Sequence, residues 1–143
     1  MWNDVDKVNI EKLRSLNQPV AKILAIHTGG NEAKKASFDV AKGLEPQLLL
    51  AKRARVMLTA NLWTKEGLVN GSMGTVHDIM FKNQGPSSLP AAVFVKFDAY
   101  EGSTITSTEG DNVVPIVPIK RSWEGKSGTI CSRQQVPLCL AWQ

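Results

Sequence analysis

Lys120, Arg121 and Trp123 are the residues best suited to chemistry with a polyanion, because two cations and an indole fall within four positions. Cationic side chains can neutralise phosphates, and an indole can stack on a base for about 1–3 kcal/mol. Arg133 and Lys96 are further cations of this kind. These residues predict a nucleic-acid-binding site, although a core tryptophan beside solvent-facing cations would be an equally ordinary use of them.

The tripeptide Gly125-Lys126-Ser127 reproduces the end of the phosphate-binding loop G-x-x-x-x-G-K-[ST]. The first glycine of that motif would fall on Lys120, and the loop would contain Trp123 and Glu124 where backbone N–H groups must surround phosphates. A strand-like sequence follows, instead of the helix whose N-terminus would stabilise an anion. We therefore expect a turn here and no ATP site.

Other catalytic groups have little support. Four potential zinc ligands lack any C-x-x-C or H-x-x-x-H spacing; they are His27, His77, Cys131 and Cys139. Four carboxylates lie in a loop without an apolar wall to separate their pKa values; they are Asp98, Glu101, Glu109 and Asp111. We expect core cysteines, solvated carboxylates, and no catalytic, metal or cofactor site within the chain.

The composition is that of a globular domain. The chain has 143 residues, of which 43% are hydrophobic, and a formal net charge of +4. This charge is compatible with a polyanionic partner but does not require one. No apolar run approaches the ~20 residues that span a bilayer, so the sequence gives no support for a membrane partner.

The first half of the chain mixes helical and strand patterns. Apolar residues at three- and four-residue steps predict an amphipathic helix at 3–16. The Val- and Ile-rich stretch 20–27 predicts a strand, 31–45 a surface excursion with a short helical turn, and 48–51 an edge strand. Alternation of apolar residues at 55–60 predicts a half-buried strand.

The pair Asn70-Gly71 is the strongest short turn signal, because both central positions of a type I′ turn favour positive φ. Gly67 and Gly74 flank the pair. This glycine-rich element predicts a tight hairpin that fixes the strand at 55–60 against another at 75–81.

The second half reads as a small β-rich barrel or sheet. Further strands are expected at 91–97, 113–120 and 129–140, separated by Gly, Pro, Ser and Asn clusters. Pro115 and Pro118 cannot donate ladder hydrogen bonds. They therefore confine the strand at 113–120 to the edge of a sheet or to a bulged strand.

Several blocks carry a family resemblance. The longest are ARVMLTANLWTKEGLVNGSMGTV at 54–76 and SRQQVPLCLAW at 132–142, with shorter blocks at 16–20, 93–98 and 115–123 in the family's order. Together they resemble the Pif-type, RecD-like ATP-dependent DNA helicases of superfamily one, particularly divergent fungal and transposon-derived copies. Blocks in a shared order are more specific than any single motif.

The resemblance implies an α/β fold: a partial RecA-like second motor domain with an inserted small β-barrel of the Src-homology type. Residues 1–66 are then expected to belong to the motor domain, 67–128 to the barrel, and 129–143 to a strand that returns to the motor domain. The ATP-binding first motor domain would precede Met1, and a His-Lys-Ser-Gln-Gly motif would follow Gln143.

For the whole enzyme, the resemblance implies ATP and Mg²⁺ as cofactors and 5′-to-3′ unwinding of DNA in repair, recombination or telomere maintenance, in the nucleus or a mitochondrion. The chain alone is expected to be a helicase fragment without ATPase activity. Its expected partners are single-stranded or forked DNA and the first motor domain. The alternatives are a stand-alone module that binds single-stranded DNA and a non-functional transposon-derived relic.

Arg53 departs from the family pattern, which usually has Gly immediately before the block at 54–76. If the position requires positive φ, an Arg there costs about 1–2 kcal/mol.

Overall fold

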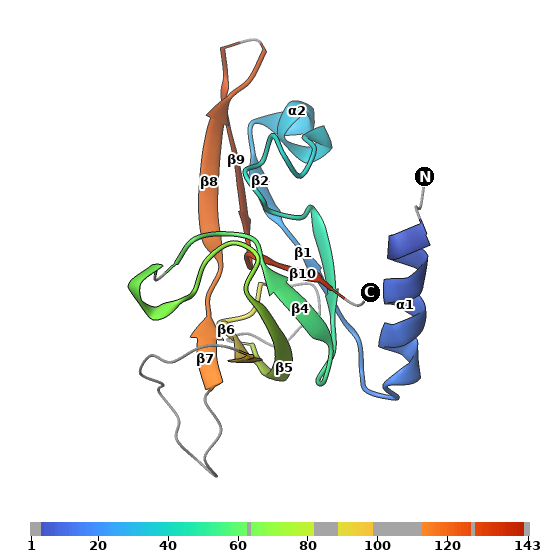
Figure 1. Ribbon diagram of the computed structural model, residues 1–143. Helices are drawn as coiled ribbons and strands as arrows, with labels where there is room; N and C mark the ends of the chain where they lie inside the picture. The colour runs from blue at the N-terminus through green and yellow to red at the C-terminus, as the bar shows by residue number, and fades with distance from the viewer. Residues whose placement is uncertain (1–3, 63, 82–88, 99–112, 127, 142–143) are drawn as a thin grey trace.

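The computed structural model describes residues 4–62, 64–81, 89–98, 113–126 and 128–141, and these form mostly β-sheet. The helix predicted at 3–16 is α1 (Asp4–Ser15), and its Leu13 belongs to the hydrophobic core. The short helical turn expected in 31–45 is α2 (Gly30–Lys35). Figure 1 shows α1 along the right side of the molecule and α2 near the top.

The described strands form three antiparallel sheets. A five-stranded sheet has the order β10 (Leu138–Leu140), β4 (Arg55–Leu58), β5 (Met73–Met80), β6 (Ala92–Phe97), β7 (Val113–Ile116). A three-stranded sheet has the order β2 (Ile26–Thr28), β9 (Ile130–Gln135), β8 (Ile119–Glu124). The third sheet pairs β1 (Ala21–Leu24) with β3 (Gln47–Leu50).

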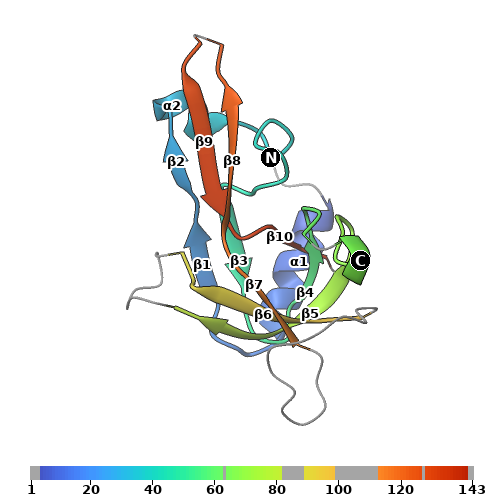
Figure 2. The ribbon, with the colours of Figure 1, turned by 90° about the vertical axis from the view of Figure 1, so that its left-hand side faces the viewer.

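Three strands predicted as single elements are each divided between two sheets. The stretch 20–27 breaks at Ala25 into β1 and β2. The Ala25 N–H donates to the Pro46 carbonyl at 3.0 Å, which continues the register of β1 with β3, but Pro46 has no N–H to donate in return. The stretch 113–120 breaks before β8 at Pro118, and 129–140 breaks at Pro137 between β9 and β10. Neither proline has an N–H to continue a ladder. The division lets β2, β8 and β9 rise away from the five-stranded sheet (Figures 1 and 2).

The predicted edge position of 113–120 is confirmed. β7, which contains Pro115, ends the five-stranded sheet, and β8 ends the three-stranded one. Pro115 therefore lies within an edge strand and Pro118 immediately before one, where a missing donor disrupts no central ladder.

The predicted pairing of the strand at 55–60 with that at 75–81 is confirmed, with Arg55 opposite Thr75. The predicted type I′ turn is wrong. Gly71 has φ 102°, but Asn70 is not among the described non-glycine residues with positive φ, and the Ser72 N–H donates to the Val69 carbonyl at 2.9 Å. Positive φ at the second central position alone is typical of a type II turn.

The glycines around this turn have different tasks. Gly67 also has positive φ, 84°, and precedes the turn in a connection that contains the 3₁₀ helix η1 (Thr64–Glu66). Gly74 lies within β5 opposite β6, where an added Cβ would stand 2.7 Å from Val95 Cγ1 and 2.8 Å from the Lys96 carbonyl oxygen. Gly74 therefore permits close approach of two strands.

The hydrophobic core joins α1 to the two-stranded sheet and to the five-stranded sheet. It includes Leu13 from α1, Ile23 from β1, Val56 from β4 and Val95 from β6, each at most 2% exposed. This packing fixes the positions of the helix and the strands, and therefore of the polar residues that they carry.

Candidate nucleic-acid-binding site

The three residues Lys120, Arg121 and Trp123 all lie on β8, but they do not share a face. Successive side chains of a strand point to opposite sides. Lys120 is exposed on one side with Ser122, whereas Arg121 and Trp123 are half-buried on the other. The structure therefore keeps Arg121 and Trp123 together and separates them from Lys120.

Arg133 is not available to DNA, and its prediction as a surface contact is wrong. Its side chain is 0% exposed. Its Nε–H donates to His27 Nε2 at 3.0 Å, and its two terminal nitrogens donate to three carbonyls. These carbonyls, at 2.8–3.2 Å, belong to Ala33, Ala36 and Leu44. Arg133 thus fastens α2 and the following loop to β9.

Gln135, two residues along the same strand, has a matching structural task. Its Nε2 donates to the carbonyls of Ile23 and Glu45, both at 3.2 Å, and its Oε1 accepts from the Val136 N–H at 2.9 Å. It is 0% exposed. The block at 132–142 therefore supplies buried polar side chains that satisfy backbone groups near the strand breaks.

Lys96 lies at the other end of the molecule, on β6, and is exposed. It lines a hollow of about 350 Å³ with Lys52, Arg53 and His77, together with Gln18, Thr75 and Val76. Sequence reasoning missed this group except for Lys96 itself. The run Lys52-Arg53-Ala54-Arg55 is the signal that could have found it.

Arg55 lies next to this hollow but is engaged elsewhere. Its guanidinium donates to both carboxylate oxygens of Asp98, at 2.9 and 2.7 Å, and to Thr75 Oγ1 at 2.9 Å. Hydrogen bonding to Asp98 raises the pKa of Arg55, and the same bonds lower the pKa of Asp98. The charge of Arg55 is thus largely compensated within the protein.

The turn expected at Gly125-Lys126-Ser127 is confirmed for the residues that the structure describes, which exclude Ser127. Gly125 N–H donates to the Thr129 carbonyl at 2.8 Å, and the chain continues as strand β9. The Lys126 N–H donates to the carboxylate of Glu32 at 2.6 Å. The Lys126 N–H, which an ATP-binding loop would direct at a phosphate, is thus already bonded to a carboxylate.

The remaining candidate groups behave as packing or surface residues. Cys131 is buried, and burial raises the pKa of the Cys139 thiol to about 11, which keeps it protonated and unreactive at neutral pH. Within the described ranges, no group of three or more His, Cys, Asp and Glu side chains could hold a metal ion. Glu101, Glu109 and Asp111 lie outside those ranges.

Among the helices described, none is long and apolar enough to cross a membrane.

Comparisons with known proteins identify relatives along nearly the whole chain. It is 31% identical over 141 residues to an ATP-dependent DNA helicase PIF1 of Danio rerio, covering 98% of this chain and 19% of that protein. It is 38% identical over 96 residues to the Xenopus laevis protein of the same name, covering 67% of this chain and 12% of the relative. No protein-family model matches the chain.

Solved structures give the same result. The Pif1 helicase of Candida albicans superposes with a TM-score of 0.71 at 27% identity, covering 97% of this chain and 33% of that one. A Bacteroides Pif1 structure described as bound to single-stranded DNA matches in fold, with a TM-score of 0.63 at 22% identity, and covers 97% of this chain and 28% of its own. The chain therefore belongs to the Pif1-type helicases and corresponds to one segment of its longer relatives.

Proposed function

We propose that the chain is part of the second motor domain of an ATP-dependent DNA helicase, with its small inserted β-barrel, and that alone it binds single-stranded DNA without hydrolysing ATP. Family membership supports the helicase origin. The observation that carries the DNA-binding proposal is the shared face of Arg121 and Trp123 on the edge strand β8. A cation and an indole two positions apart can bind a phosphate and stack on the neighbouring base.

The proposed inserted unit is wider than 67–128. The five-stranded sheet joins β4 and β10 to β5, β6 and β7, so a boundary at residue 67 or 128 would cut hydrogen-bonded ladders. We therefore assign β4 to β10, together with β2, which pairs with β9, to the β-rich unit. In this proposal α1 and the pair of β1 with β3 belong to the RecA-like portion.

In the full-length enzyme, we propose that ATP and Mg²⁺ are bound by a first motor domain that lies outside this chain and forms its main partner. Positioning and charge compensation of the phosphates are the requirements of that reaction. Single-stranded or forked DNA is the proposed substrate, and the nucleus or a mitochondrion the proposed compartment, since both follow from the helicase assignment.

The DNA-binding proposal is tested by fluorescence anisotropy of a labelled single-stranded oligonucleotide. If about three cations of the chain engage the backbone, log affinity should fall with log salt at a slope near −2. Arg121→Ala should weaken binding and make the slope less negative by about 0.7, and Trp123→Ala should weaken binding through lost stacking. Lys120→Ala is the matched control, because it removes one charge from the opposite face of the same strand.

Equal losses for Lys120→Ala and Arg121→Ala would contradict the choice of face, and unchanged affinity for Arg121→Ala would remove the site. The absence of catalysis has a separate test. The purified chain should not turn over ATP in a coupled phosphate-release assay. Turnover that Lys126→Ala abolishes would overturn both this proposal and the assignment of the β8–β9 turn.

A further inference from the structure

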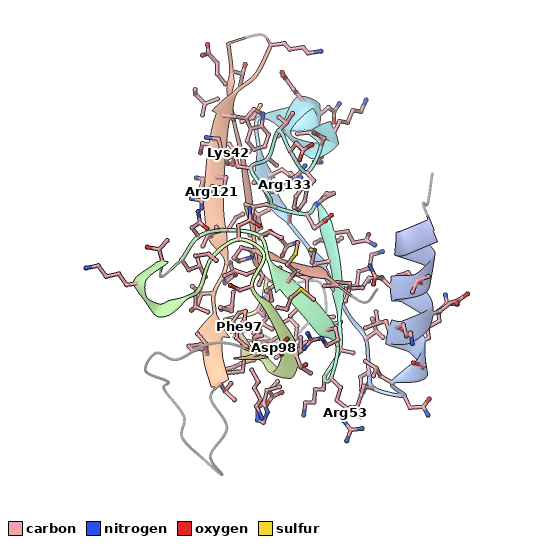
Figure 3. All side chains as sticks on the ribbon, in the orientation of Figure 1. Lys42, Arg53, Phe97, Asp98, Arg121 and Arg133 are labelled. Atoms are coloured by element: carbon pink, nitrogen blue, oxygen red, sulfur yellow. The ribbon has the colours of Figure 1, made fainter. Side chains whose placement is uncertain are left out.

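The hollow beside Lys96 is a second place where the surface is built for an anion. Its walls come from four parts of the chain: Gln18 after α1, the β3–β4 connection with Lys52 and Arg53, β5, and β6. Figure 3 places Arg53 at the lower edge of the molecule, whereas Arg121 lies on β8 in the upper part. The hollow is therefore separate from the Arg121–Trp123 face.

Charge in the hollow is one-sided. Three of its lining residues are cations, Lys52, Arg53 and Lys96, and none of the described lining residues is a carboxylate. Asp78 lies beside the hollow, with its carboxylate 3.6 Å from Lys52 Nζ, and both side chains are more than half exposed. Such an exposed pair contributes little and is easily exchanged for another anion.

Polar side chains complete the lining. The Thr75 hydroxyl accepts from Arg55 at 2.9 Å, which leaves its own hydrogen to be donated. His77 stands at the register shift of β5 between Val76 and Asp78, a bulge that turns a side chain away from the regular ladder. Gln18 supplies an amide. Phosphate oxygens accept several hydrogen bonds at once, and this set of donors suits them.

Arg53 has an unfavourable backbone at this point. Its φ is 75°, in the left-handed region, and its N–H donates to the Val76 carbonyl at 2.8 Å. Glycine would adopt this conformation without strain. Strained residues cluster at functional sites because the surrounding structure holds them there for a task. Here the strained residue adds a guanidinium to a hollow that already contains two lysines.

We propose that this hollow binds a phosphate group of a nucleic-acid backbone, with Arg53, Lys96 and Lys52 as its cationic contacts. The inference rests on the proposed DNA-binding function and extends it to a second contact point. One strand that reached both places would cross the molecule from β8 to the β3–β4 connection. A free nucleotide or inorganic phosphate carries the same chemistry, so the experiment separates these sources.

Arg53→Gly is the decisive variant, because the two roles of Arg53 change in opposite directions. Removing about 1–2 kcal/mol of strain should raise the Tm by roughly 3–8 °C. Removing the guanidinium should weaken binding of a labelled oligonucleotide and make its salt slope less negative by about 0.7. Lys96→Ala should reproduce the loss of binding without the gain in Tm. Lys35→Ala, an exposed cation on α2 at the other end, should leave the slope unchanged.

The sources are distinguished by titrating the ¹⁵N-labelled chain with inorganic phosphate, ADP and a 15-nucleotide single strand while following the amide signals of residues 52–54 and 75–77. If the signal shifts saturate at a lower concentration with the oligonucleotide than with ADP or inorganic phosphate, the ligand is a backbone phosphate. If ADP saturates them at the lowest concentration, the ligand is a free nucleotide and the assignment to a backbone phosphate is overturned. Arg53→Gly with a higher Tm and unchanged oligonucleotide affinity and slope would overturn the site altogether.

Failure of this inference is distinct from failure of the proposed function. If Arg121→Ala weakens DNA binding and Arg53→Gly does not, the β8 face stands and the hollow is not a contact. If the chain binds no oligonucleotide, the DNA-binding function fails, and the inferred nucleic-acid phosphate site fails with it.

Discussion

Arg133 and His27 face each other across β9 and β2, and the Arg133 Nε–H donates to His27 Nε2 at 3.0 Å. The acceptor must be an unprotonated nitrogen, so the bond requires a neutral imidazole. Burial, then the charges of Arg133 and Lys34, lower the pKa of His27. This contact joins the buried cation of the block at 132–142 to a titratable side chain on the neighbouring strand.

The first prediction concerns Arg133 itself. Arg133→Met keeps much of the volume but removes the Arg133 donors from the carbonyls of Ala36 and Leu44, whereas the Ala33 carbonyl keeps the Ala36 N–H at 3.4 Å. Buried groups that lose a partner cost about 1–3 kcal/mol each, so the free energy of unfolding should fall by about 2 kcal/mol or more. Urea unfolding followed by circular dichroism measures it. Arg121→Ala, on a half-buried edge position, should change stability by less than about 1 kcal/mol.

The second prediction is a pH dependence from His27. Because its folded pKa is below the usual 6.5, the unfolded chain binds the proton first as pH falls. The contribution of His27 is therefore constant above about pH 6.5, and stability is lost as pH falls from there toward the folded pKa. His27→Gln retains an acceptor for Arg133 and should flatten the change in urea midpoint between pH 7.5 and 5.5. His77→Gln is the control, and an equal flattening there would contradict the assignment.

The third prediction separates the glycines of the turn region. Gly74→Ala should cost about 1–3 kcal/mol, because the new methyl group would overlap Val95 and the Lys96 backbone. Gly71 has nothing within 4 Å of its added Cβ, so only its positive φ opposes substitution. Gly71→Asn should therefore be mild, since Asn tolerates this conformation. Thermal unfolding of both variants compares them, and similar losses would argue against close strand packing at Gly74.

The fourth prediction concerns the Arg55–Asp98 pair. Although its geometry is bidentate, the two side chains are 30% and 53% exposed, so Asp98→Asn should cost less than about 1 kcal/mol. The folded pKa of Asp98 is lowered, so its contribution is present above the unfolded pKa and is lost as pH falls through the folded value. Wild type and Asp98→Asn should thus converge in urea midpoint near pH 2. A difference that persists at that pH would point to packing.

Local patterns were sufficient for the elements whose signal lies in neighbouring residues. The apolar spacing at 3–16 predicts α1, and alternation at 55–60 predicts β4. The same patterns could not reveal where a strand changes sheet. Ala25 carries no breaker of its own, and the strand is interrupted where its partner across the β1–β3 ladder is Pro46, 21 positions away, which has no N–H to donate.

The candidate site, like the fold, was only partly predictable from local patterns. The sequence by itself determined which side chains could meet a phosphate, because charge and aromatic character belong to the residue. Only the tertiary structure decided which of them can be reached. Arg133 and Arg121 have the same chemistry and lie opposite each other, yet Arg133 sits on a central strand beneath α2 and Arg121 on an edge. Burial is a property of the neighbours that a fold brings from far along the chain, and so no local pattern contains it.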